Sequence, residues 1–235
     1  MTPRRVRRPS RLKAAVSPLA AAVLAPTAAC ALWAAASAAV GVGARGDGLW
    51  FAAGAATWAA CDLLGLRLRR AYVFAHELTH ALAAWAGGGK VFAFVVRGES
   101  GRVDLSHVSP FVALAPYWIP LYALGVAGVY RLAIWGWGAP RAREAFLAAM
   151  GAALAFHLFH TGRSLLETHQ SDLDEAGPAL SLALIALLNA GLLLFALKCL
   201  FPERVDAASA FDTVRGGTAA FWGGAVRLAA GLVAR

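Results

Sequence analysis

Two histidines and a glutamate stand at a spacing that suits zinc-dependent hydrolysis. His76 and His80 are four residues apart, and Glu77 directly follows the first of them. On a helix, residues four apart differ by about 40° in direction and stand one turn apart, so both imidazoles can reach one ion. Glu77 can then take a proton from a zinc-bound water and pass it to a leaving amine. The motif predicts Zn²⁺ held by His76 and His80, with Glu77 as the catalytic base.

The residues around this motif are apolar over 71–86. Imidazoles and carboxylates inside an apolar segment each cost several kcal/mol unless they are paired or bound to a metal. One ion would satisfy several of these groups at once. The alternative is a buried polar network that holds helices together.

The composition indicates a membrane protein. The chain has 235 residues, of which 60% are hydrophobic and 15% charged, and its mean hydropathy is +0.61. A soluble domain has about 45–50% apolar and about 25% charged residues. The apolar residues are gathered into long blocks, as in proteins that a bilayer surrounds. This excludes a single soluble enzyme domain and a disordered chain.

The expected fold is an all-α polytopic membrane protein with about six spans and a small β-hairpin. The hairpin is predicted at 90–106, where β-rich segments flank a turn, after the glycines at 87–89 end a helix. Pro116 and Pro120 should kink the span that contains them. The expected spans are 14–43, 49–66, 71–86, 111–135, 144–161 and 179–201.

This pattern divides the chain into four parts. A basic cytoplasmic tail (1–13) precedes two N-terminal spans (14–66), a catalytic membrane core (67–201) and a C-terminal tail (202–235) with a weak amphipathic stretch. We expect the first block to be a retained signal anchor rather than a cleaved signal peptide. The three cysteines, Cys30, Cys61 and Cys199, have no paired spacing and predict neither a disulfide framework nor a zinc knuckle.

The net charge of +9 is unevenly distributed. Six basic residues precede the first apolar block without an acid, which is typical of a cytoplasmic flank. No basic-aromatic face follows them, so no nucleic-acid partner is expected. Alternating spans from a cytoplasmic N-terminus place the basic clusters at 67–70, 131–143 and 198–204 inside, and the loop at 162–177 outside.

With these motifs in view, the segment from about 70 to 175 resembles the site-2 protease family of intramembrane zinc metalloproteases. The resemblance is carried by His76-Glu77-Leu78-Thr79-His80, the Gly-rich residues after it, the hairpin, and a span that opens with Leu114-Ala115-Pro116-Tyr117. It implies that His76 and His80 are zinc ligands, that Glu77 is the base, and that a later Asp completes the ligand set. It also implies that the hairpin pairs with extended substrate by strand addition.

The third ligand is where the chain departs from the family. The usual Asp lies in an Asn-Pro…Leu-Asp-Gly pattern, and the comparable place here is His169–Glu175, where Leu173-Asp174 is followed by Glu. A Gln-x-Asp-Leu reading at Gln170–Leu173 is similar to a divergent bacterial branch and favours Asp172. The alternatives are Asp174 or one of His157, His160 and Glu167. His157 and His160 are three apart on one helical face and could line the active site.

The resemblance implies a multi-pass protease of the bacterial cytoplasmic membrane that cleaves a polypeptide, with a transmembrane segment as the expected substrate. One alternative is a catalytically inactive metal-binding membrane protein. Another is a metal-handling transporter, which would need several ligand clusters where only one strong cluster exists.

The alternating topology places Asp172 outside the cell, whereas the zinc site of the family lies nearer the cytosol. The sequence predicts no particular oligomeric state.

Overall fold

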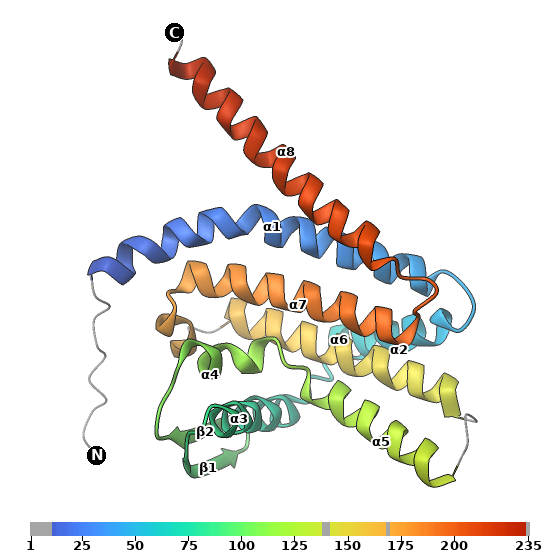
Figure 1. Cartoon of the computed structure of the whole chain (residues 1–235). Coiled ribbons are helices and arrows are strands. Elements are labelled where there is room, and N and C mark those ends of the chain that lie inside the picture. The colour runs from blue at the N-terminus through green and yellow to red at the C-terminus, as the bar shows by residue number, and fades with distance from the viewer. Residues whose placement is uncertain (1–10, 138–141, 168–169, 234–235) are drawn as a thin grey trace.

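The protein is a bundle of long helices with one hairpin at a corner (Figure 1). The computed structural model describes residues 11–137, 142–167 and 170–233. The expectation of a mainly helical chain with a small hairpin is confirmed. The helices are α1 (Arg11–Gly43), α2 (Gly48–Leu63), α3 (Arg69–Ala86), α4 (Pro110–Leu114), α5 (Leu121–Trp137), α6 (Arg143–Glu167), α7 (Pro178–Leu200) and α8 (Ala207–Val233), with short 3-10 turns at η1 (Ala115–Tyr117) and η3 (Ser171–Glu175).

The predicted count of six spans is not supported. Within the described residues, α1, α6 and α7 are long and apolar enough to cross a membrane, and the pair α4–η1 and α5, bent by 72°, would make a fourth. Helix α2 has 16 residues and rises about 24 Å, less than a hydrocarbon core of about 30 Å. Helix α3 has 18 residues but carries Arg69, Arg70 and Glu77, which lower its hydropathy.

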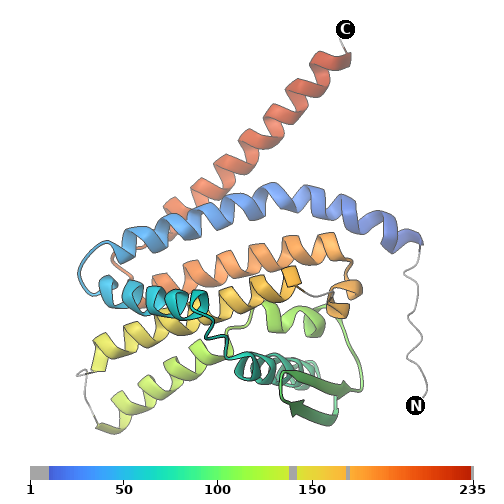
Figure 2. The same cartoon turned by 180° about the vertical axis from the view of Figure 1, so that it is seen from behind.

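The expected topology is also wrong in the placement of two basic clusters. Arg143 and Arg204 pair with Asp47, at 2.8 and 2.7 Å, in the turn after α1. They therefore lie at the opposite end of the bundle from the start of α1. The reason is that α2 runs along the body while α3 runs across it (Figures 1 and 2), and neither is a candidate span where two crossings were expected.

The end where α1 begins also holds the hairpin, η3 and the start of α7 (Figures 1 and 2). Gly177, directly before α7, packs against the hydroxyl of Ser17 in the first part of α1. The segment that carries Asp172 therefore lies at the same end as the start of α1. The alternating topology instead predicts that this segment and the N-terminus lie on opposite sides of the membrane.

Close helix packing forms the body of the bundle. Gly54 of α2 lies against the Ala148 carbonyl of α6, and Gly151 of α6 lies against the Phe51 carbonyl of α2. A side chain at either glycine would overlap the facing backbone, so α2 and α6 approach closely because these positions are glycine. The main apolar cluster joins α1, α2, α6 and the end of α7 through Val42, Phe51, Leu147, Leu154, Leu197 and Phe201.

Both terminal segments contain a helix where the structure describes them. Residues 1–10 of the predicted tail lie outside the described residues, and α1 already begins at Arg11. Within the predicted C-terminal tail, α8 packs its Val214 near Ala31 and Ala35 of α1 and then leaves the bundle (Figure 1). Its further part is exposed, including Phe221 and Leu228.

The hairpin consists of antiparallel strands β1 (Val91–Arg97) and β2 (Ser100–Leu105). Gly98 has φ of +60°, which a glycine adopts without strain, and so supplies the tight turn. Gly88, with φ of +75°, ends α3 in the same way. The predicted hairpin at 90–106 is confirmed.

Candidate metal centre

Three metal-ligating side chains converge at one point. His76 and His80 come from α3, and Asp172 comes from η3. The Asp172 Oδ2 atom lies 3.4 Å from His76 Nε2 and 3.4 Å from His80 Nε2. All three candidate ligand atoms lie within 4.8 Å of one another. No other group of three such residues within ligand distance exists in the described part of the chain.

These separations fit a zinc ion. Two ligands that each stand about 2.0–2.1 Å from a tetrahedral zinc lie about 3.4 Å apart. An N–H···O hydrogen bond is shorter, about 2.7–3.2 Å. Two neutral imidazoles and one carboxylate are a donor set that catalytic zinc uses, and three protein ligands leave the fourth position open.

The imidazole of His80 is oriented by a backbone carbonyl. His80 Nδ1 donates to the Val112 carbonyl of α4 at 2.8 Å. That carbonyl lacks its usual helical partner because the residue four positions on is Pro116, which has no N–H. The proline therefore frees an acceptor that holds the Nδ1 proton of His80 and leaves Nε2 facing Asp172.

The Tyr117 hydroxyl supports the carboxylate ligand. Tyr117 is fully buried in η1, and its hydroxyl lies 3.0 Å from Asp172 Oδ2 and 3.0 Å from Gln170 Oε1. Because a phenol carries one proton, it donates to one of these oxygens at a time. The Tyr117 carbonyl accepts from Asn189 Nδ2 of α7 at 2.8 Å, which ties the broken helix to the neighbouring span.

Asp172 is held by the anchoring of η3. The next residue, Leu173, is buried with Leu114, Tyr117 and Ile185, and its carbonyl accepts from the Ser181 hydroxyl at 3.0 Å. Burial disfavours ionisation of Asp172, but the imidazoles beside it outweigh that effect and hold the pKa of this carboxyl well below its usual range. Asp172 is therefore ionised at neutral pH, as a carboxylate ligand of a metal would have to be.

His76 is positioned by aromatic rings. Its ring centroid lies 5.2 Å from that of Tyr117, 4.8 Å from that of His80 and 5.7 Å from that of Tyr72. Its Nδ1 is buried and has no hydrogen-bond partner in the part of the chain that the structure describes. Packing rather than a hydrogen bond therefore fixes this imidazole.

Glu77 lies between α3 and the hairpin. A Cβ atom at Gly101 of β2 would stand 2.6 Å from Glu77 Cγ and 3.0 Å from its Oε1, so the strand passes directly over this carboxylate. Burial raises the pKa of the Glu77 carboxyl. Glu77 and His76 line one cavity of about 240 Å³, which has room for water and part of a ligand.

The other predicted site residues that the structure describes do not belong to the three-residue cluster. Asp174 is exposed on η3. His157 is buried, with Nε2 3.2 Å from Asn189 Oδ1. His160 lines the cavity beside Glu77, but its nitrogens lie 3.2 and 3.1 Å from the carbonyls of Phe156 and Arg67. Glu167 ends α6, and its side chain lies outside the described residues.

Sequence reasoning missed Tyr117, Asn189 and Gly101 as parts of the site. The prolines on either side of Tyr117 were the available signal, since they predict a broken helix with free carbonyls. Asn189 lies in an otherwise apolar span and Gly101 in a turn-rich segment. The neighbouring residues in the sequence do not indicate the role of either.

Comparison with protein-family models, with curated proteins and with solved structures finds no match for this chain. A candidate centre of two imidazoles and a carboxylate, one of whose imidazoles lines a cavity with Glu77, is suited to metal-assisted hydrolysis.

Proposed function

We propose that the protein is a zinc metalloprotease of the membrane, similar to the site-2 proteases. The observation that carries this proposal is the convergence of His76, His80 and Asp172, together with the cavity under the hairpin that His76 and Glu77 line. The nitrogens of His76 and His80 and the carboxylate of Asp172 would hold the ion. When bound, zinc supplies Lewis-acid polarisation and lowers the pKa of water.

In the proposed reaction, Glu77 moves the proton. A water oxygen forms a bond to the peptide carbonyl carbon, and the Glu77 carboxylate accepts the proton that the water loses. Glu77 then gives this proton to the peptide nitrogen as the C–N bond breaks. The products are a new carboxyl group and a new amine. Burial of Glu77 favours its protonated form between these two transfers.

The proposed substrate is a membrane or membrane-adjacent polypeptide that enters in an extended form. An intact helix hides its carbonyls in internal hydrogen bonds, so the segment must unwind to react. With the N-terminus in the cytoplasm of a bacterial cell, the metal centre would lie toward the cytoplasmic side, because it shares the end of the bundle where α1 begins. This placement agrees with what the resemblance implies.

The test is Glu77→Gln in the full chain, purified in detergent. Zinc content is measured by mass spectrometry, and cleavage is measured on a panel of synthetic single-span peptides. We expect both proteins to carry about one zinc, and cleavage by Glu77→Gln to fall by about 10²–10⁴-fold, the usual contribution of a general base. Glu144→Gln, an exposed carboxylate on α6, is the matched control and should cleave normally.

Equal cleavage by wild type and Glu77→Gln would refute the catalytic assignment. A wild-type protein that binds zinc stoichiometrically but cleaves no peptide of the panel would favour the catalytically inactive metal-binding protein instead.

A further inference from the structure

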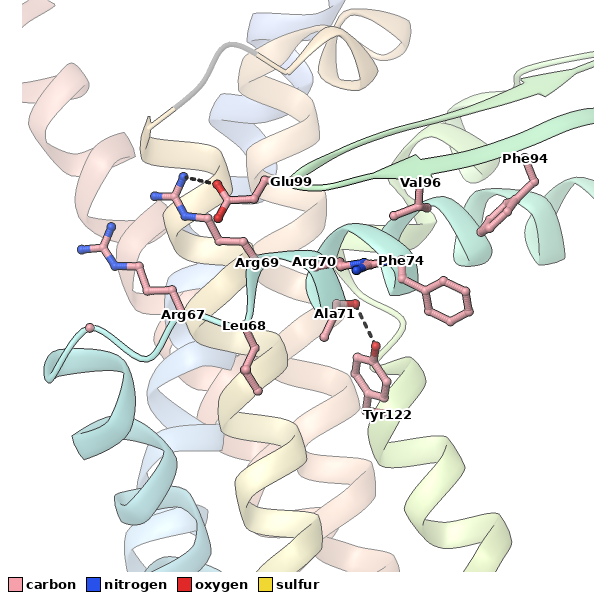
Figure 3. Close-up of a pocket in the computed structure, with 11 residues that line it drawn as sticks. Arg67, Leu68, Arg69, Arg70, Ala71, Phe74, Phe94, Val96, Glu99 and Tyr122 are labelled. Atoms are coloured by element: carbon pink, nitrogen blue, oxygen red, sulfur yellow. Dashed lines mark hydrogen bonds and ion pairs between the residues drawn. The ribbon is translucent and has the colours of Figure 1, made fainter.

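A second hollow, of about 970 Å³, lies beside the metal centre between the start of α3, the hairpin and α5 (Figure 3). Arg67, Arg69 and Arg70 fan out from the segment that leads into α3, and Glu99 faces Arg69 from the hairpin turn (Figure 3). We call this hollow the arginine cleft. Its aromatic wall consists of Phe74, Phe94 and Tyr122.

The arginine cleft carries uncompensated positive charge. Arg69 pairs with Glu99 at 3.6 Å. Among the described residues, neither Arg67 nor Arg70 has a carboxylate partner. A concave surface with excess charge of one sign concentrates ligands of the opposite sign. The arginine cleft therefore favours an anionic ligand.

The aromatic wall adds apolar surface beside these charges. Phe74 of α3 and Phe94 of β1 meet edge to face, with ring centroids 5.9 Å apart. Arg70 and Phe74 are four residues apart on α3 and so occupy the same face. The Tyr122 hydroxyl donates to the Ala71 carbonyl at 2.8 Å and fixes the α5 side of the wall. A ligand with an acidic group next to an apolar group fits this combination.

The arginine cleft adjoins the catalytic cavity, with the Arg69–Glu99 ion pair between them. Arg69 and Glu99 line both spaces. Arg69 and His76 are seven residues apart on α3, which places them on one side of the helix and about 10 Å apart along its axis. An extended chain advances about 3.3 Å per residue, so a side chain about three residues from the scissile bond would reach Arg69.

We propose that the arginine cleft binds an acidic segment of the polypeptide substrate, with carboxylates at Arg67 and Arg70 and an apolar side chain against Phe74 and Phe94. This inference rests on the proposed function and names a substrate feature for the same site. Glu99 already presents a carboxylate to Arg69 at the boundary of the two spaces, and a substrate carboxylate takes its place. A peptide is favoured over an anionic lipid because the cleft adjoins the cavity that Glu77 lines, so one extended chain could occupy both.

The experiment measures binding without cleavage, using Glu77→Gln as the background in the full chain. The probes are two synthetic single-span peptides with the same fluorophore, one with three glutamates beside the span and one with glutamines there. We expect the acidic peptide to bind at least about tenfold more tightly, equivalent to about 1.4 kcal/mol. Adding Arg67→Gln and Arg70→Gln should reduce its affinity to that of the glutamine peptide.

The matched control replaces Arg131 and Arg227, two exposed arginines on α5 and α8, by glutamine. It makes the same change in net charge and should keep the preference for the acidic peptide. Zinc content and circular dichroism are measured for every variant, so that a folding defect is seen directly.

Equal affinity for the two peptides, or a preference that survives the Arg67 and Arg70 replacements, would overturn the inference. Competition by phosphatidylglycerol micelles without any peptide preference would assign the arginine cleft to lipid and also overturn it. Because this assay needs no cleavage, a failed protease test with a retained acidic preference would count against the reaction and not against the cleft.

Discussion

Tyr117 links the candidate metal ligands to the rest of the protein. Its hydroxyl lies beside Asp172, its ring packs against that of His76, and its carbonyl is held by Asn189. Hydrogen-bonded neighbours of this kind orient metal ligands and tune their affinity. The side chain is fully buried, so water cannot replace its hydrogen bond.

Replacing Tyr117 by phenylalanine should therefore weaken zinc binding. Loss of a hydrogen-bonded neighbour of this kind reduces metal affinity by about 10–100-fold. The measurement is a competition titration of the full chain with a zinc chelator. Tyr122→Phe is the control, because it loses a hydrogen bond to the Ala71 carbonyl away from the cluster and should bind zinc as the wild type does. Unchanged affinity in Tyr117→Phe would mean that Tyr117 does not support Asp172.

At the residue scale, the sequence predicts the local part of the site and not the distant part. His76 and His80 follow from helical periodicity, since one helix carries both. Asp172 lies far along the chain, and the residues alone did not separate it from Asp174, which is exposed on the same turn. The burial of Leu173 decides which of the two faces inward, and that depends on tertiary packing with Leu114 and Ile185.

At the scale of elements, two features bring the site together. The helix broken at Pro116 and Pro120 frees the carbonyls of Val112 and Tyr117. The hairpin covers Glu77, and Gly101 makes this close approach of strand and helix possible. Both elements can be predicted from turn and proline patterns, but their contacts with α3 cannot, because they depend on tertiary packing.

Gly101→Ala should reduce catalysis without removing the metal. The new Cβ would stand 2.6 Å from Glu77 Cγ and 2.8 Å from Val73 Cγ1, so Glu77 must move while the histidines keep their places. A displacement of about 1 Å at a reacting group can reduce the rate by about 100-fold. We expect at least about tenfold slower peptide cleavage at unchanged zinc content.

The control for this variant is Gly125→Ala on α5, where a Cβ meets nothing within 4 Å. It should leave both cleavage and zinc content unchanged. A Gly101→Ala protein that cleaves as fast as the wild type would show that the hairpin does not fix the position of Glu77.

At the scale of the whole molecule, two basic clusters lie at the other end of the helix bundle from the one that a count of charges along the sequence predicts. Arg143 and Arg204 lie at the end of the bundle opposite the start of α1, where both pair with Asp47. The Arg143 guanidinium, together with Arg204, holds the pKa of Asp47 below its usual range. This pairing offsets part of the positive charge of the two clusters, so counting their basic residues alone overstates what they say about sidedness, which is one reason why the sequence misplaced them. The other reason is that α2 and α3 were each counted as a crossing.

With the N-terminus in the cytoplasm, Arg45 should face the outside and the hairpin turn the inside. Arg45 is exposed in the turn after α1, and Ser100 is exposed at the start of β2. Single cysteines at these positions, in a chain whose three native cysteines are replaced by serine, are tested in intact cells with a membrane-impermeant maleimide. We expect labelling of Arg45→Cys in intact cells and of Ser100→Cys only after permeabilisation. Labelling of both from outside would contradict this arrangement.

The zinc content of purified full-length protein tests the central claim most directly, when it is compared between wild type, Asp172→Ala and Asp174→Ala. The two substitutions remove carboxylates of the same turn, of which Asp172 faces the histidines and Asp174 is exposed. We predict about one zinc per chain in wild type and Asp174→Ala, and less than about a tenth of that in Asp172→Ala, because two imidazoles alone do not complete the site. A wild-type protein without zinc after supplementation, or an Asp172→Ala protein that retains it fully, would contradict the account.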